Sequence, residues 1–465
     1  MAKHYPIKAR EHPMVKAIPS RASVSQPGSL KFGQFRLSDK LRTEGVPLAD
    51  DAPPSFLNPP RNPSMVSSYD GAIKKLLFSI PNACIERVED TENPFLALYK
   101  RVFATLTESI ELVVVTHVSA VSMVETILRD AGLLVRTKLI IVPDRFNFTL
   151  WAEDPYLVNI DKDQNVWLVE PSELVRGADR YLADIVVESG TPGLKRRASP
   201  LFFRGGNTLV GDKFILIGGD TLDACWASVF DPEAGPRQPS DIFDHTKDIR
   251  KFIDNQFKQQ LDWDRPFIAV GSNRQIQGEI LCEEFDNDGE SWTQTLYSGN
   301  SKGTTQPIFH IDMFVSLVGP DPDSKKKFHL FVGDPRLAAD ILCMDLPDHA
   351  LASVFDDIAE NLKNSGFRVT RNPLPLTYAD DPKSRHRLWY YATSNNVMMQ
   401  STPTSKIVWM PTYGHGIWNE LAKTDAANTK LWNEAGYEVR PLGDFHPVAE
   451  NLGAMHCIKK YLARG

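Results

Sequence analysis

The feature that most constrains the fold is an alternation of helix-like and strand-like segments, which recurs five times after about residue 66. In the first unit, residues 121–131 carry apolar side chains at helical spacing, Gly132 provides a stop, and residues 138–143 form a β-branched run. Five such units predict a pseudo-repetitive α/β domain. The other four units are residues 172–187 with 200–203, 248–261 with 265–271, 353–366 with 367–374, and 418–436 with 437–442.

Further strand-like runs lie between these units and predict hairpins beside them. A closed repetitive α/β domain accommodates such hairpins better than an open doubly wound sheet does. With 465 residues, 42% of them hydrophobic, the chain has ample apolar material for one large core. The additional runs are residues 165–171, 213–219, 328–334, 388–393 and 406–411.

The first 65 residues have a different character from the rest of the chain. They are rich in proline, serine and basic residues, without sustained periodicity, and residues 51–63 have the composition of a proline-stiffened linker. We therefore divide the chain into an extended N-terminal arm, residues 1–65, and an α/β domain, residues 66–465. An arm that docks a partner or serves in targeting is the alternative to a simple surface extension.

Charge and cysteine usage exclude several classes of protein. A net charge of −7 argues against a nucleic-acid partner. The cysteines are odd in number, lie far apart and include no CxxC, which predicts neither disulfides nor a zinc site and favours a cytoplasmic location. No apolar run reaches the about 18 residues of a membrane span. The first 21 residues carry charge but no apolar h-region, so we expect no secretory signal. The five cysteines are residues 84, 225, 282, 343 and 457.

Four stretches put polar, reactive or glycine residues where strands are expected to end: residues 150–158, 202–219, 307–319 and the segment around Cys457. On an alternating strand, the side chains of His310 and Asp312 point to the same side. They would then share one cavity, although a solvated pair on a sheet face explains the spacing equally well.

The other stretches are ambiguous when each is taken alone. The Gly205–Gly206 pair allows a close backbone approach but also fits a plain bulge or hairpin. Asp154 precedes a proline, which is common turn chemistry. An isolated Cys457 is either a buried small apolar residue or a nucleophile.

The order of the motifs W-x-x-D, G-G-N, H-x-D and small-small-x-H-C resembles that of the guanidino-group-modifying superfamily, most closely agmatine deiminases and bacterial peptidylarginine deiminases. The runs at 390–399 (YYATSNNVMM) and 408–414 (VWMPTYG) resemble segments upstream of the family's cysteine. The resemblance covers roughly residues 85–462. It implies a pentein-type fivefold α/β propeller and cysteine-dependent hydrolysis of a guanidino compound to a ureido product and ammonia, without a metal or organic cofactor.

The resemblance also implies roles for individual residues. Asp154 and Asp312 match carboxylates that bind the guanidinium, and Cys457 matches the attacking thiol. His310 matches the acid that protonates the leaving amine and then activates water. Neighbouring residues on a strand point to opposite faces, so His456 is expected to pack or position rather than to act as the base. The remaining predicted substrate contacts are Trp151, Arg204, Gly205, Gly206 and Asn207.

Three residues depart from the family pattern. Arg204 replaces a glutamate, Glu153 replaces an arginine, and Lys459 replaces a threonine. One hypothesis is that Glu153 and Arg204 form a pair, as if the two charges had been exchanged. Alternatively, Arg204 turns outward, binds an anionic part of the substrate, or signals a lost or altered activity.

Three other functions remain as alternatives: an amidinotransferase on the same fold, a non-catalytic binding protein and a Cys-His-Asp protease. The expected substrate is a small-molecule or peptidyl guanidino compound such as agmatine, arginine or an arginyl residue. We expect no nucleic-acid or membrane partner, and a homo-oligomer is compatible with the sequence.

Overall fold

The computed structural model describes residues 60–86, 92–172, 178–199, 201–230, 255–274, 276–324 and 327–465. Most of the predicted N-terminal arm therefore lies outside the described residues. The end of the arm is part of the body, because β1 (Ser64–Met65) pairs antiparallel with β5 (Leu157–Ile160). None of the helices among the described residues is long and apolar enough to cross a bilayer.

Five of the six sheets in the described residues repeat one pairing pattern, in which the first strand is antiparallel to the second and the second is parallel to the third. In each sheet we call the strand that is antiparallel to the middle strand of this pattern the lead strand. The five lead strands are β21, β5, β8, β13 and β18. The strands are β21 (Lys459–Arg464), β2 (Ile73–Ile80), β3 (Glu111–His117) and β4 (Thr137–Val142); β5, β6 (Val166–Glu170) and β7 (Leu194–Ala198); β8 (Thr208–Val210), β9 (Ile215–Gly218) and β10 (Phe267–Val270); β13 (Val315–Pro320), β14 (Phe328–Asp334) and β15 (Arg368–Pro373); and β18 (Met398–Ser401), β19 (Lys406–Thr412) and β20 (Glu438–Asp444).

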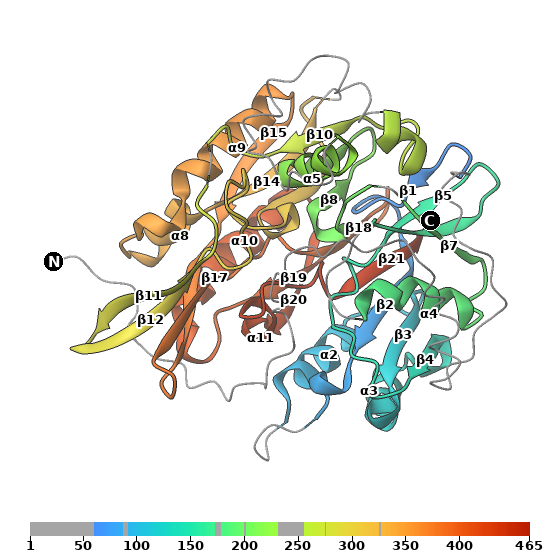
Figure 1. The fold of residues 1–465 in the computed structure, drawn as a ribbon, viewed down its shortest axis with the longest axis horizontal. Coiled ribbons are helices and arrows are strands. Elements are labelled where there is room, and N and C mark those ends of the chain that lie inside the picture. The colour runs from blue at the N-terminus through green and yellow to red at the C-terminus, as the bar shows by residue number, and fades with distance from the viewer. Residues whose placement is uncertain are drawn as a thin grey trace.

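Helices connect the parallel strands, as a parallel pair requires a crossover. Figure 1 shows them on the outside of the sheets. The α/β class and its repetition are therefore confirmed, whereas the closed fivefold propeller stays a prediction. The crossover helices are α2 (Pro94–Ala104), α3 (Val121–Asp130), α4 (Leu182–Glu188), α5 (Gly219–Phe230), α8 (Pro335–Leu342), α9 (Ala352–Asn364) and α10 (Ala422–Glu434), while the short α11 (His446–Ala449) leads toward β21.

The predicted units differ in how well they match. The helix α3 and its stop agree with the sequence: Gly132 has φ +69° just after the helix ends. The strand predicted at 200–203 is wrong, because the strand of that unit is β7, a few residues earlier. The β7 sequence, LKRRA, is too polar to predict a strand. In the structure Arg197 is nevertheless buried, and it donates a hydrogen bond to Gln260.

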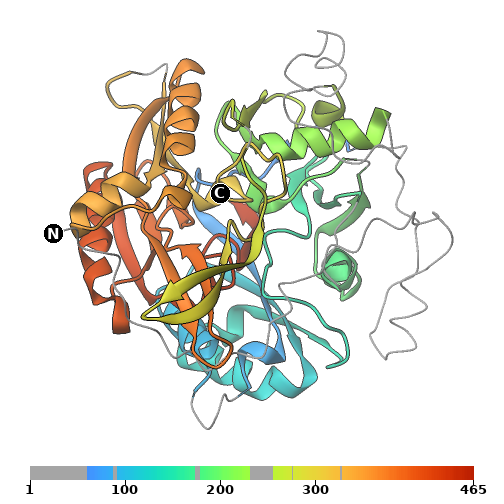
Figure 2. The same ribbon diagram turned by 60° about the vertical axis from the view of Figure 1, so that its left-hand side comes forward.

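The sixth sheet, which we call the accessory sheet, joins two hairpins that are distant in sequence. Its strands are ordered β11 (Ile280–Asn287), β12 (Glu290–Leu296), β17 (His386–Tyr391) and β16 (Leu376–Asp381). The tip of the β11–β12 hairpin projects from the body in Figure 1, and in Figure 2, where this side is turned forward, the yellow hairpin lies in front of the body. Strand β12 ends at Leu296, and the chain continues from there to the predicted His310 segment.

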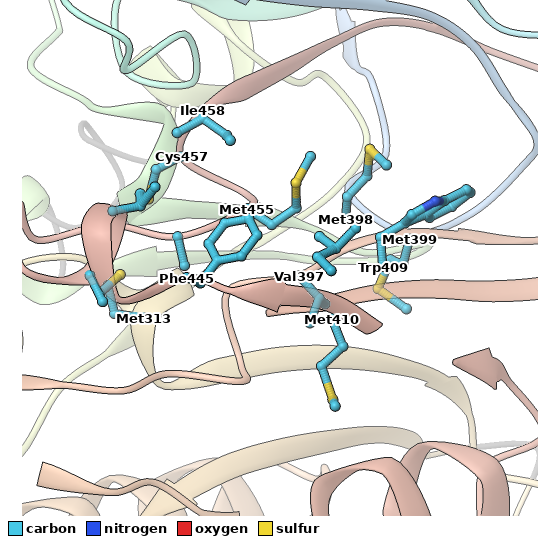
Figure 3. Packing of buried hydrophobic residues seen from close by; sticks show 14 of the residues in the cluster. Met313, Val397, Met398, Met399, Trp409, Met410, Phe445, Met455, Cys457 and Ile458 are labelled. Carbon is cyan, nitrogen blue, oxygen red and sulfur yellow. The ribbon is translucent and has the colours of Figure 1, made fainter. Parts of the chain in front are cut away.

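The core next to Cys457 is unusually rich in methionine (Figure 3). Cys457 belongs to this cluster and is 5% exposed. Methionine is unbranched and adaptable, so it fills an irregular space behind a turn without imposing one rotamer. The methionines of the cluster labelled in Figure 3 are Met313, Met398, Met399, Met410 and Met455.

Candidate active site

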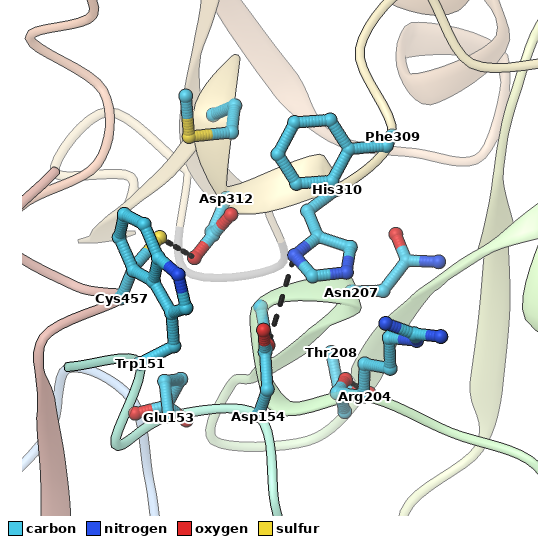
Figure 4. Close-up of polar contacts among 12 residues, drawn as sticks. Trp151, Glu153, Asp154, Arg204, Asn207, Thr208, Phe309, His310, Asp312 and Cys457 are labelled. Carbon is cyan, nitrogen blue, oxygen red and sulfur yellow. Dashed lines mark hydrogen bonds and ion pairs between the residues drawn. The ribbon is translucent and has the colours of Figure 1, made fainter. Parts of the chain in front are cut away.

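Each of the five repeated sheets contributes a polar or glycine residue from the turn in front of its lead strand. These residues are Asp154 before β5, Gly206 before β8, Asp312 before β13, Asn396 before β18 and Cys457 before β21. The turns occupy equivalent positions in the five units, and contacts among the five residues bring them together. Figure 4 shows three of them, Asp154, Asp312 and Cys457. The repetition of the fold therefore builds the site.

Gly206 lies at the centre of the group. Its amide donates to Asp154 Oδ1 at 3.2 Å, and His310 Nδ1 lies 3.7 Å from the same oxygen. A Cβ on Gly206 would lie 2.6 Å from His310 Nδ1 and 3.1 Å from Asp312 Oδ2. Any side chain at this position would therefore intrude among the imidazole and both carboxylates.

His310 and Asp312 are close together, but they do not lie on an alternating strand as predicted. His310 is extended and precedes a short 3₁₀ turn, Ile311–Met313, which leads into β13. Asn207 Oδ1 anchors the turn by accepting the Ile311 amide at 3.1 Å. The curl of the backbone, rather than strand alternation, brings both side chains to one side.

Asn396 is the residue that sequence reasoning missed. Its amide Nδ2 donates to Cys457 Sγ at 3.2 Å, and its Oδ1 accepts the backbone amides of His456 at 2.7 Å and Cys457 at 3.3 Å. It therefore fixes both the thiol and the turn that carries it. Two features of the sequence point to Asn396. It lies in the run at 390–399 that resembles a deiminase segment, and it stands two residues before a lead strand, as Cys457 does.

His456 and Cys457 both contact Asp312, so the expectation that they face opposite sides is wrong. His456 Nδ1 is 2.9 Å from Asp312 Oδ2, and Cys457 Sγ is 3.7 Å from the same atom. The residues belong to a turn rather than a strand. The contact agrees with a positioning role for His456.

Asp312 is under-compensated among the described residues. Its Oδ1 is buried without a hydrogen-bond partner there. Burial raises the pKa of the Asp312 carboxyl more than the contact with His456 lowers it. This oxygen is a free acceptor that a hydrogen-bond donor of a bound ligand can satisfy.

Glu153 forms a buried cluster with two lysines, which we call the Glu153 triad. Its carboxylate lies 2.9 Å from Lys459 Nζ and 2.8 Å from Lys460 Nζ. Burial raises the pKa of Glu153, but the two cations outweigh burial and bring this pKa to about 2. Its backbone amide also donates to Cys457 O at 3.1 Å, so the triad ties the Trp151–Asp154 turn to the cysteine turn.

The triad corrects the hypothesis that Glu153 pairs with Arg204. Two of the departures from the family pattern, Glu153 and Lys459, are partners of each other. Arg204 is half-buried and, in Figure 4, lies on the side of His310 and Asp154 that faces away from Cys457.

The remaining predicted contacts have structural partners of their own. Asn207 Oδ1 also accepts from Gln306 Nε2 at 2.9 Å, so the Asn207 side chain braces the His310 turn rather than offering its carbonyl to a ligand. A Cβ on Gly205 would lie 1.9 Å from the Glu153 carbonyl oxygen, so glycine permits this close approach of two turns. Trp151 packs against Gly453 in the same manner.

The surroundings of Cys457 favour its protonated thiol over the thiolate. Burial raises its pKa well above the ordinary value, and the negative charge of Asp312 raises it further. The amide of Asn396 and the cation of Lys459 oppose this shift without reversing it. A cation bound beside Asp312 would lower the pKa of the thiol. Within the part of the chain that the structure describes, no three His, Cys, Asp or Glu side chains are grouped to hold a metal ion.

Comparison with known proteins identifies the fold. No family model matches the sequence, and no curated protein sequence does. Among solved structures, a proposed peptidyl-arginine deiminase aligns with a TM-score of 0.54 at 13% identity, over 87% of this chain and 99% of that one. A proposed agmatine deiminase aligns with a TM-score of 0.55 at 12% identity, over 87% of this chain and 97% of that one. The chain has the fold of these deiminases. At this identity, the deiminase fold is what the likeness establishes.

Proposed function

We propose that the protein is a Cys457-dependent hydrolase that converts a guanidino compound into a ureido product and ammonia. The observation that carries the proposal is the convergence of Asp154, His310 and Asp312 on Gly206, with Cys457 Sγ 3.7 Å from Asp312 Oδ2. A guanidinium is planar and presents its donors as a fork, which matches carboxylates that converge on one small space.

Binding comes first and prepares the thiol. The guanidinium donates to Asp154 and to the unpartnered Oδ1 of Asp312, which supplies the positive charge that Asp312 lacks. The same charge lowers the pKa of Cys457 and favours its thiolate beside the guanidinium carbon. The substrate therefore activates its own nucleophile.

The chemical steps then use the thiol and one imidazole. The thiolate forms a bond to the guanidinium carbon, and the tetrahedral adduct expels ammonia after His310 protonates that nitrogen. The covalent product is an S-substituted thiouronium on Cys457. His310 next takes a proton from water, whose oxygen attacks the same carbon, and collapse of the adduct returns the thiolate and releases the ureido product.

Ammonia release tests the proposal. Wild-type protein is incubated with arginine, agmatine, arginyl peptides and simple alkylguanidines, and ammonia and ureido product are quantified together. We expect both in equal amounts, and neither from Cys457→Ser. Transfer of the amidino group to added glycine or lysine without ammonia would replace hydrolysis with the amidinotransferase alternative.

A thiol probe separates an enzyme from a binding protein. 2-Chloroacetamidine carries a planar cation like that of the substrate, so we expect it to modify Cys457 faster than neutral chloroacetamide does, with the preference lost in Asp312→Asn. The exposed Cys282 and Cys343 serve as internal controls in peptide mapping, because they lie outside the candidate site. Equal reactivity of Cys457 toward both probes would contradict the proposed site.

A further inference from the structure

A cavity of about 40 Å³ lies against the candidate site, between the accessory sheet and the turns that carry the predicted catalytic residues. Three of its lining residues are sequence neighbours of the site: Phe309 before His310, Met313 after Asp312, and Leu452 before the cysteine turn. The Phe309 and His310 ring centroids are 4.6 Å apart. The cavity therefore shares a wall with the proposed reaction centre.

Met313 gives the most direct link between the cavity and the thiol. The amide Nδ2 of Asn396 lies 3.5 Å from Met313 Sδ and 3.2 Å from Cys457 Sγ. The thioether and the thiol therefore flank one amide group. Met313 therefore touches both the cavity and the amide group that holds the thiol.

The described lining carries no formal charge near pH 7, and aromatic and aliphatic side chains make up most of it. None of the described residues around the cavity is an aspartate, glutamate, lysine or arginine. The one titratable imidazole is His349, whose pKa burial lowers to about 4, so it is neutral near pH 7. The aromatic members are Tyr297, Phe309, Trp389, Tyr390 and Tyr391.

Two of the tyrosines direct their hydroxyl groups to partners elsewhere in the protein. The Tyr390 hydroxyl lies 2.7 Å from His446 Nδ1, and the Tyr391 hydroxyl donates to Ala350 O at 2.8 Å. Their rings rather than their polar ends are thus offered to the cavity. An ammonium or carboxylate placed here would lose its hydration without direct contact with an opposite charge, because the acidic groups that act on the lining, Glu283 and Asp348, are not part of it.

We infer that this cavity receives the substituent of the guanidino substrate, and that the substituent is uncharged and apolar. The inference rests on the proposed function and names its substrate class. A single water molecule needs a cavity of about 10–15 Å³, so this one suits a slim group such as a short alkyl chain or the edge of a ring. Agmatine and free arginine carry charged groups on the chain attached to the guanidinium and are therefore poorer matches.

A matched series of substrates tests the inference. Pentylguanidine, agmatine and 5-guanidinopentanoate have nearly the same length and differ in their terminal methyl, ammonium or carboxylate group. We expect kcat/KM for pentylguanidine to exceed that of both charged analogues by roughly tenfold or more, which corresponds to about 1.4 kcal/mol. A charged analogue that equals or surpasses pentylguanidine would overturn the inference.

A charge placed in the lining should move the preference. Ser298 is half-buried in the cavity wall, so Ser298→Asp is expected to raise the agmatine-to-pentylguanidine ratio of kcat/KM about tenfold. Ser291→Asp adds the same charge on the exposed part of β12, outside the lining, and should leave the ratio unchanged. An unchanged ratio in folded Ser298→Asp counts against the cavity.

The two proposals fail in different ways. 2-Chloroacetamidine has no substituent to fill the cavity, so its reaction at Cys457 depends on the proposed guanidinium site alone. If it shows no preference for Cys457 over neutral chloroacetamide, the proposed function falls. If it does show that preference while the three analogues react equally well, the cavity inference alone falls.

Discussion

The two groups of buried charge beside Cys457 differ in how completely they are balanced. In the Glu153 triad, both carboxylate oxygens have a lysine partner, and the carboxyl pKa is brought to about 2. In the proposed reaction centre, Asp312 has a raised pKa and an oxygen without a partner among the described residues. The comparison shows two uses of a buried carboxylate. A carboxylate that is paired with cations of the protein holds turns together, whereas one that lacks such a partner is available to a cationic ligand.

The largest expected effect comes from unbalancing the triad. Glu153→Gln leaves two buried ammonium groups without their counterion, so the free energy of unfolding should fall by about 3–5 kcal/mol, measured by denaturant unfolding. The control is Glu111→Gln, whose exposed pair with Lys75 should cost less than about 1 kcal/mol. Similar values for the two variants would show that the triad is not a structural clamp.

The converse change, at the under-compensated carboxylate, should affect activity rather than stability. Asp312→Asn keeps an acceptor for His456 but removes the charge, so we expect kcat/KM to fall about a hundredfold to a thousandfold with little change in melting temperature. Asp380→Asn is the matched control, because Asp380 is buried and satisfied by Arg387 at 2.7 and 2.8 Å. That variant should lose stability, while its activity per folded molecule should persist. The opposite pattern would refute the comparison.

The smallest expected effect is the acid dependence of stability. An unfolded glutamate protonates near pH 4.3, whereas Glu153 in the folded protein has a pKa of about 2. The unfolded state therefore binds more protons between these values, and stability should fall as pH drops from about 4.5 toward 2. Chemical unfolding at several pH values should show a shallower decline for Glu153→Gln. Parallel curves would mean that the triad contributes nothing to acid lability.

Much of the fold could be predicted because its units are local. Hydrophobic periodicity and a glycine stop suffice for α3 and β4. The failures occur where long-range contacts override local composition. Strand β7 contains charged residues that are buried by distant partners, and the 3₁₀ turn after His310 is held by Asn207, about a hundred residues away in sequence.

The same division holds for the candidate site. The sequence alone singled out Asp154, His310, Asp312 and Cys457, because the residue types and their order are visible along the chain. It did not reveal Asn396, whose importance comes from equivalence to Cys457 in another repeat. It also assigned Glu153 to Arg204 rather than to Lys459 and Lys460.

By itself, then, the sequence determined which chemical groups are present, in what order, and that they belong to a repeated α/β unit. Only the tertiary structure decided which groups touch. Hydrogen bonds and ion pairs act over a few ångströms, while Glu153 and Lys459 are separated by about three hundred residues, so their pairing is set by how the repeats pack. The same packing pairs the Glu153 carboxylate with two lysines and leaves Oδ1 of Asp312 without a partner among the described residues.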